Sequence, residues 1–183
     1  MRTIHNQKQI EQLEGERALV GTFVDRSYNR QKIEWLLQAR DGFDEHARDA
    51  WHLLIPVAEG YGVDSWIEPQ QFGVALAGQI IDKLEIAFED LPCIVFRAAD
   101  SEYFFLKLGG KTRDQFFEEI GRIADIARQC QRESKAEGEA FRNYVNMQVA
   151  NHLRRRRLLS ATRSALPALS ALLGGVVDFR ELV

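Results

Sequence analysis

The chain has 183 residues, of which 45% are hydrophobic and 28% are charged, and its formal net charge is −3. A chain of this length can bury one sizeable core, and this composition is typical of a globular protein. It contains no run of roughly 18 to 20 apolar residues that could cross a bilayer, and its first residues lack the apolar core of a signal peptide. The sequence therefore predicts a cytoplasmic protein with free thiols.

Hydrophobic periodicity predicts strands that alternate with helices along most of the chain. Short apolar runs indicate buried strands, and apolar residues spaced three or four apart indicate helices. In chain order, the predicted elements are a short strand at 2–5, a helix at 7–14 capped by Asn6, a strand at 17–25, helices at 29–40 and 43–50, a strand at 51–58, a helix at 70–88, strands at 93–98 and 102–108, a helix from 112 past 128 and a helix at 137–163.

Prolines and glycines modify two of these elements. Pro56 indicates an edge, a bulge or the end of its strand, because proline cannot donate to a sheet ladder. Gly73 and Gly78 weaken the helix at 70–88 by about 1 kcal/mol each relative to alanine, unless another part of the chain packs closely on them. Strands alternating with helices predict a mostly parallel sheet covered on both faces, and the close spacing of the last two strands predicts an antiparallel hairpin.

The charge is distributed unevenly between the body and the tail. Residues 131–183 contain nine Lys and Arg against five Asp and Glu, whereas residues 1–130 contain 15 against 22. A basic tail on an acidic body suggests two parts with different roles. We therefore predict a domain at 1–130 and a helical, basic and apolar C-terminal extension at 131–183.

The order of elements over about residues 2–128 resembles thioredoxin, with its βαβαβαββα layout. Three local matches carry the resemblance: a strand ending in "GTFVD" that leads into a helix, "LP" at the opening of the penultimate strand, and "FFLKLGG" followed by a helix. The resemblance implies an α/β three-layer sandwich followed by the C-terminal extension. It also implies that Pro92 is a cis-proline beside the active site.

The strand-to-helix junction departs from the thioredoxin pattern. The family carries Cys-x-x-Cys there, but residues 25–31 of this chain contain no cysteine. Dithiol exchange needs one thiolate to attack and a second thiol to resolve the mixed disulfide. The sequence therefore favours a redox-inactive protein. The alternative is an enzyme with a single catalytic thiol, Cys93, in peroxide or glutathione chemistry, although its apolar surroundings also suit a buried core cysteine.

A binding groove is the second hypothesis that follows from the resemblance. The cluster at the predicted helix N-terminus could hold an anion or a partner's carboxylate, and it would line a peptide groove together with Leu91 and Pro92. The alternative is a solvated loop with a capping residue. The members of the cluster are Arg26, Ser27, Tyr28, Asn29 and Arg30.

No metal or cofactor site is predicted. The acidic and histidine residues of the stretch 44–52 lack the spacing of a known metal site and favour a surface charge cluster. These residues are Asp44, Glu45, His46, Asp49 and His52. The chain also contains no phosphate loop, no dinucleotide fingerprint and no serine nucleophile elbow.

Four consecutive arginines mark the extension as a contact surface. They surround a helix on all sides, so they need solvent, acidic partners, phosphate or lipid headgroups. A stretch rich in leucine follows them, interrupted by Pro167. The predicted contact residues are Arg154, Arg155, Arg156, Arg157, Leu158 and Leu159.

Several partners fit this extension. It could fold back on the body or swap into a second copy to form a homodimer, it could dock on another protein, or it could lie on an anionic membrane surface. One arginine run on an acidic chain does not predict nucleic-acid binding. The hypothesis that unites these observations is a redox-inactive, thioredoxin-like interaction or assembly module.

Overall fold

The computed structural model describes residues 1–26, 30–58, 60–61, 67–97 and 103–172, and for 157–172 it describes the backbone alone. In chain order, its strands and α-helices are β1 (Arg2–Ile4), α1 (Gln7–Leu13), β2 (Leu19–Val24), α2 (Arg30–Gln38), α3 (Arg40–Ala47), β3 (Trp51–Pro56), α4 (Val74–Lys83), β4 (Cys93–Arg97), β5 (Tyr103–Lys107), α5 (Arg113–Glu133) and α6 (Gly138–Leu172). The chain divides into two compact units, Met1–Val149 and Ala150–Val183.

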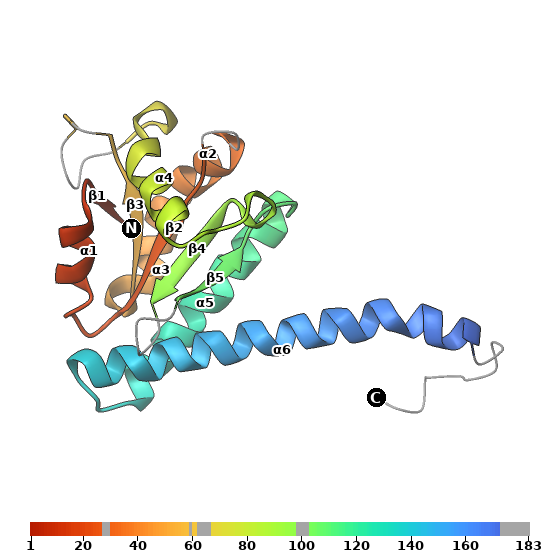
Figure 1. The fold of residues 1–183 in the computed structure, drawn as a ribbon. Coiled ribbons are helices and arrows are strands. Elements are labelled where there is room, and N and C mark those ends of the chain that lie inside the picture. The colour runs from red at the N-terminus through yellow and green to blue at the C-terminus, as the bar shows by residue number, and fades with distance from the viewer. Residues whose placement is uncertain (27–29, 59, 62–66, 98–102, 173–183) are drawn as a thin grey trace. The chain divides into compact units, whose positions relative to one another are not determined.

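The five strands form one mixed sheet in the order β1-β3-β2-β4-β5 (Figure 1). β3 pairs in parallel with β1 and with β2, whereas β4 pairs antiparallel with β2 and with β5. In the hairpin, Cys93 lies opposite Lys107 and Arg97 lies opposite Tyr103. The prediction of an α/β fold with a terminal antiparallel hairpin is confirmed, whereas the prediction of a mostly parallel sheet is wrong, because β4 also pairs antiparallel with β2.

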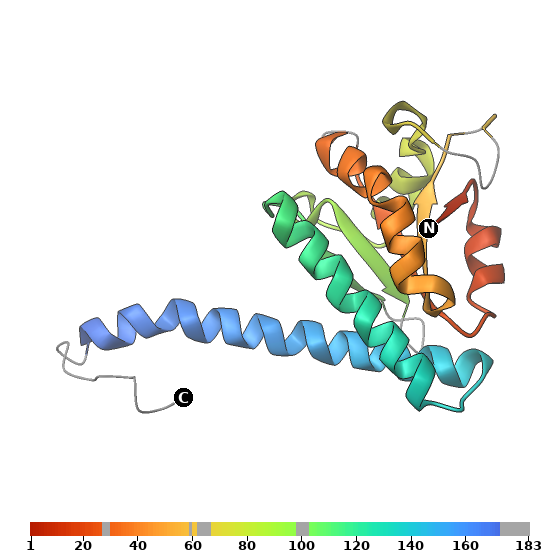
Figure 2. The same ribbon diagram turned by 180° about the vertical axis from the view of Figure 1, so that it is seen from behind.

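Helices cover both faces of the sheet. α1 and α4 lie on one side, which we call the α4 face, where Val20 and Leu54 pack with Ile10 and Leu76. α2, α3 and α5 lie on the other side, the α5 face (Figure 2). There the ring of Trp51 in β3 packs 5.0 Å from that of Phe43 and 6.1 Å from that of Phe96. The three layers therefore enclose two apolar cores, one on each side of the sheet.

Local capping signals explain where two helices begin. Asn6 Oδ1 accepts a hydrogen bond from Gln9 N at 3.2 Å, and Gln9 Oε1 accepts one from Asn6 N at 3.3 Å. Thr112 and Gln115 make the same reciprocal pair at the start of α5. Each pair satisfies backbone donors that the first helical turn leaves free. The predicted cap at Asn6 is confirmed.

The helix predicted at 70–88 is too long at both ends. α4 starts at Val74 because the preceding segment turns back onto the end of β3, where Gly73 N donates to Pro56 O at 2.9 Å. It ends at Lys83, and the left-handed backbone of Glu85, with φ of 52°, terminates the helical path. Pro56 is the last residue of β3, one of the places that its chemistry allows.

α6 extends further than the helix predicted at 137–163. It runs from Gly138 to Leu172 and continues past Pro167. Its beginning belongs to the first compact unit, where Phe141, Val145 and Val149 are buried. Among the residues that the structure describes, no helix has both the length and the apolar character that crossing a membrane requires.

The two glycines of the 70–88 segment differ in their surroundings, so alanine should affect them in opposite directions. A Cβ at Gly73 would lie 2.7 Å from backbone atoms of Val57, whereas one at Gly78 would meet nothing within 4 Å. We expect Gly73→Ala to lower the free energy of unfolding by about 1–3 kcal/mol. We expect Gly78→Ala, its matched control inside α4, to raise it by about 0.5–1 kcal/mol. Urea unfolding measures both, and equal effects would show that Val57 does not restrict the residue at position 73.

Candidate functional site

The two apolar residues of the predicted groove are part of the core. The peptide bond between Leu91 and Pro92 is cis, as predicted, and both side chains are buried. Pro92 O accepts a hydrogen bond from Leu108 N at 2.8 Å, and a Cβ at Gly109 would lie 2.5 Å from Leu91 O. This tight packing joins the segment to the end of β5 and leaves Leu91 and Pro92 little surface for a peptide.

The described basic residues of the predicted groove already have acidic partners. Arg26 forms an ion pair with Asp82 of α4, and Arg30 Nε lies 3.2 Å from Glu34 Oε1 within α2. Ser27, Tyr28 and Asn29 lie outside the described residues. The groove therefore stays a prediction. Of its described residues, the two arginines have acidic partners, and Leu91 and Pro92 are buried.

Both cysteines are buried. Cys93 is 0% exposed at the start of β4, and burial, followed by the carboxylates of Asp90 and Asp25, raises the pKa of its thiol to about 12. Cys130 is 3% exposed near the end of α5, and burial raises the pKa of its thiol too. At neutral pH both groups are protonated and shielded, which is unfavourable for a nucleophile.

The rate at which the two thiols are alkylated tests directly whether they are buried in the native protein. At pH 8 we expect neither cysteine of the native protein to be alkylated by iodoacetamide within an hour, whereas both react in 6 M guanidinium chloride. The rate of native labelling should follow global unfolding, because only unfolding exposes the thiolates. Rapid labelling of Cys93 in the native protein, located by peptide mass spectrometry, would restore the single-thiol hypothesis.

The histidines of the acidic stretch 44–52 lie apart. His46 Nε2 is 2.9 Å from Asp125 of α5 on the surface, and buried His52 Nε2 is 2.7 Å from Glu16 Oε2. Burial, followed by the nearby charge of Arg2, lowers the pKa of His52. Within the described part of the chain, no three His, Cys, Asp or Glu side chains are placed to share a metal ion.

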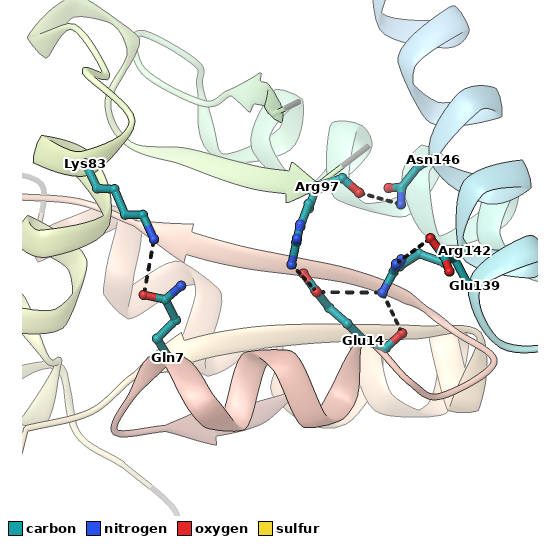
Figure 3. A network of polar contacts seen from close by, with 7 residues as sticks. All are labelled: Gln7, Glu14, Lys83, Arg97, Glu139, Arg142 and Asn146. Carbon is teal, nitrogen blue, oxygen red and sulfur yellow. Dashed lines mark hydrogen bonds and ion pairs between the residues drawn. The ribbon is translucent and has the colours of Figure 1, made fainter. Parts of the chain in front are cut away.

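A polar network around Glu14 joins three distant segments (Figure 3). The Glu14 side chain is 8% exposed, and its Oε2 lies 2.9 Å from Arg97 Nη1 and 3.7 Å from Arg142 Nη1. Arg142 Nη1 also donates to Glu14 O at 3.0 Å. One buried carboxylate at the end of α1 therefore holds an arginine from β4 and another from α6.

Further contacts hold the beginning of α6 against the rest of the first unit. Asn146 is 2% exposed, and its Nδ2 donates to Arg97 O at 2.8 Å. The guanidinium of Arg17 lies 4.9 Å from the centre of the Phe141 ring. Its Nη2 donates to Gln131 O at 2.9 Å, so Arg17 also fixes the end of α5. These contacts make the start of α6 an integral part of the first unit.

A shallow hollow of about 570 Å³ on the α4 face lies beside this network. The cavity itself measures about 60 Å³, and the rest of this space is open to solvent. That room holds several waters or one small aliphatic group, whereas pockets for cofactors measure about 300–1,000 Å³. Its walls combine apolar and charged side chains, among them Ile10, Ile80, Leu84, Lys83 and Arg97.

The predicted tail residues are only partly described. Arg154 and Arg155 are exposed and Arg156 is partly buried. Arg157, Leu158 and Leu159 belong to α6, but their side chains lie outside the described residues. The described part of the arginine run therefore includes two charged side chains that reach solvent.

Comparison with known proteins identifies no relative. No protein-family model, no curated protein and no solved structure matches the chain. The proposals below therefore depend on the residues and the fold of this chain.

Removing the charge of Glu14 should lower the stability of the fold. Glu14→Gln removes the negative charge between Arg97 and Arg142, and we expect the free energy of unfolding to fall by about 1–3 kcal/mol. Amide exchange should quicken in α6 up to Val149, because this part loses its anchor.

The matched control for Glu14→Gln is Glu34→Gln. Glu34 pairs with Arg30 on the exposed surface of α2, and its side chain is 40% exposed. We expect this change to alter the free energy of unfolding by less than about 0.5 kcal/mol. Urea unfolding and hydrogen exchange measure both variants. Equal losses of unfolding free energy would show that Glu14 stabilises the fold no more than an exposed surface pair does.

Proposed function

We propose that this chain is a redox-inactive, thioredoxin-like protein that acts as an assembly module and forms homodimers through its C-terminal segment. The observation that carries the proposal is the composition of the helix beyond Val149. The stretch 150–172 contains six leucines and a run of four arginines, and the second compact unit contains no other described element.

A single helix cannot bury its own apolar side chains, because its side chains radiate away from its axis. The leucines of 150–172 therefore need a surface from outside their own unit. A second copy supplies an equivalent helix, and a two-fold pair of helices buries both sets at once. The exposed arginines keep the helix soluble at its start and can bind acidic residues of the body of the other copy.

The thioredoxin-like part of the proposal is supported by the order of the elements. Reading α2 and α3 as one interrupted helix, residues 2–133 run strand, helix, strand, helix, strand, helix, strand, strand, helix. Pro92 immediately precedes β4, and Gly109 and Gly110 separate β5 from α5. These are the places that the resemblance assigns to them.

The redox-inactive part is supported by the thiols. No cysteine occurs at the junction between β2 and α2, and the two cysteines of the chain are buried and free. The single-thiol alternative needs an accessible thiolate at Cys93, and its burial and raised pKa oppose that role.

The test is the molar mass of the full chain and of two full-length variants by light scattering. We expect Leu158→Asp combined with Leu159→Asp to weaken self-association about tenfold or more, because the charges oppose burial of the helix. Ser160→Asp combined with Ser164→Asp is the control, since it adds the same charge to the helix and removes no leucine. We expect this control to associate like the wild type.

Two other outcomes would contradict the homodimer. If the wild-type chain stays monomeric across the micromolar range, it does not form the proposed homodimer. A chain whose leucine variant keeps its mass but no longer binds anionic phosphatidylserine vesicles uses the segment on membranes instead. Circular dichroism confirms that each variant is folded.

A further inference from the structure

The two edges of the sheet are not equally protected. β1, at one edge, has three residues, of which Thr3 is 5% and Ile4 is 1% exposed. β5, at the other edge, has five residues with the sequence YFFLK (Figure 1). Tyr103 is 38% exposed, and the next two phenylalanines are partly exposed. A long apolar edge without proline is a ready template for another strand.

The ladder between β4 and β5 determines which backbone groups of β5 point outward. Leu108 N donates to Pro92 O at 2.8 Å, so Pro92 and Leu108 form a hydrogen-bonded pair. Opposite residues of an antiparallel ladder alternate between hydrogen-bonded and non-hydrogen-bonded pairs. In the observed register, Phe104 and Leu106 therefore bond to β4.

The remaining residues of β5 direct their backbone N–H and C=O groups away from β4. They are Tyr103, Phe105 and Lys107, which lie opposite Arg97, Val95 and Cys93. The backbone hydrogen bonds made by the described residues beyond the ladders satisfy none of these outward groups. β5 therefore presents a regular row of donors and acceptors to solvent.

We propose that β5 pairs antiparallel with β5 of a second copy, so that the two sheets join into one. Only one register lets all three outward residues bond. It places Phe105 opposite its own equivalent and Tyr103 opposite Lys107 of the second copy. This arrangement is two-fold symmetric, as an interface between identical chains requires.

Side-chain chemistry is complementary in this register. On the α4 face, two Phe105 rings meet at the two-fold axis, and each Tyr103 ring covers the aliphatic stem of the opposite Lys107. On the α5 face, each Phe104 lies opposite Leu106 of the second copy, which is 4% exposed and packs mainly in its own core. Aromatic and aromatic–aliphatic pairs are among the cross-strand contacts that stabilise sheets. No like charges face each other, because Lys107 is the one charged residue of the strand.

Because residues of β5 alternately bond to β4 and point outward, pairing through β5 predicts a pattern of amide exchange that other interfaces would not produce. As protein concentration rises, amide exchange at Tyr103, Phe105 and Lys107 should slow about tenfold or more, because each N–H gains an acceptor. Exchange at Phe104 and Leu106 should not change, since β4 already binds their N–H groups. Nuclear magnetic resonance of the full chain resolves these residues one by one.

Charge substitution at the two-fold axis provides the decisive test. In full-length chains, Phe105→Lys alone and Phe105→Glu alone should each weaken β5 pairing about tenfold or more, because like charges meet at the axis. An equimolar mixture of the two variants should recover pairing, because Lys then faces Glu. Tyr61→Lys is the control, since it replaces another exposed aromatic residue, 47% exposed, that is not part of β5.

The outcomes separate this inference from the proposed function, on which it does not depend. If Phe105→Lys associates like the wild type, or if mixing restores nothing, pairing through β5 is wrong. If only Leu158→Asp with Leu159→Asp lowers the mass, the C-terminal segment assembles and β5 does not. If only the Phe105 variants lower it, β5 pairs and the C-terminal proposal fails.

Discussion

Gly21 in the middle of β2 leaves the space that the ring of Phe96 occupies on the α5 face. A Cβ at Gly21 would lie 2.7 Å from Cε1 of Phe96 and 2.9 Å from Cγ2 of Ile94. With that space, Phe96 packs 6.1 Å from the Trp51 ring and stacks on Phe104 at 5.2 Å. One absent Cβ thus allows a row of rings to link β3 to β5 across β2. Because a slip of one residue turns every side chain to the opposite face, this row also fixes the register of the hairpin.

The buried carboxylate of Glu14 imposes a second constraint, on the start of α6. A charge that is removed from water needs partners, and here the partners come from β4 and α6. The apolar contacts of Phe141, Val145 and Val149 act together with this ion pair. Residues 138–149 are therefore part of the first unit, and α6 continues from there to Leu172.

The sequence predicted what depends on neighbours along the chain and missed what depends on distant contacts. The cap at Asn6 and the hairpin at 93–108 are local patterns, and the burial of Cys93 agrees with its apolar run. The early end of α4 and the close approach of Gly73 to Val57 depend on how segments meet in space. The Glu14 network joins residues up to 128 positions apart, and no spacing rule connects the glutamate that follows α1 with Arg142. The cis bond before Pro92 followed from the resemblance to thioredoxin and not from the residues themselves.

Two self-associating surfaces on one chain would impose a condition on the assembly as a whole. Each surface is related to its copy by a two-fold axis, and two different two-fold axes produce a closed tetramer only when they cross at a right angle. Certain smaller crossing angles close larger assemblies, whereas axes that do not cross produce an open chain of molecules. The axis proposed at β5 would be fixed by the sheet, because it would pass between two Phe105 residues. The angle between this axis and the axis of the C-terminal segment would then decide whether the assembly closes.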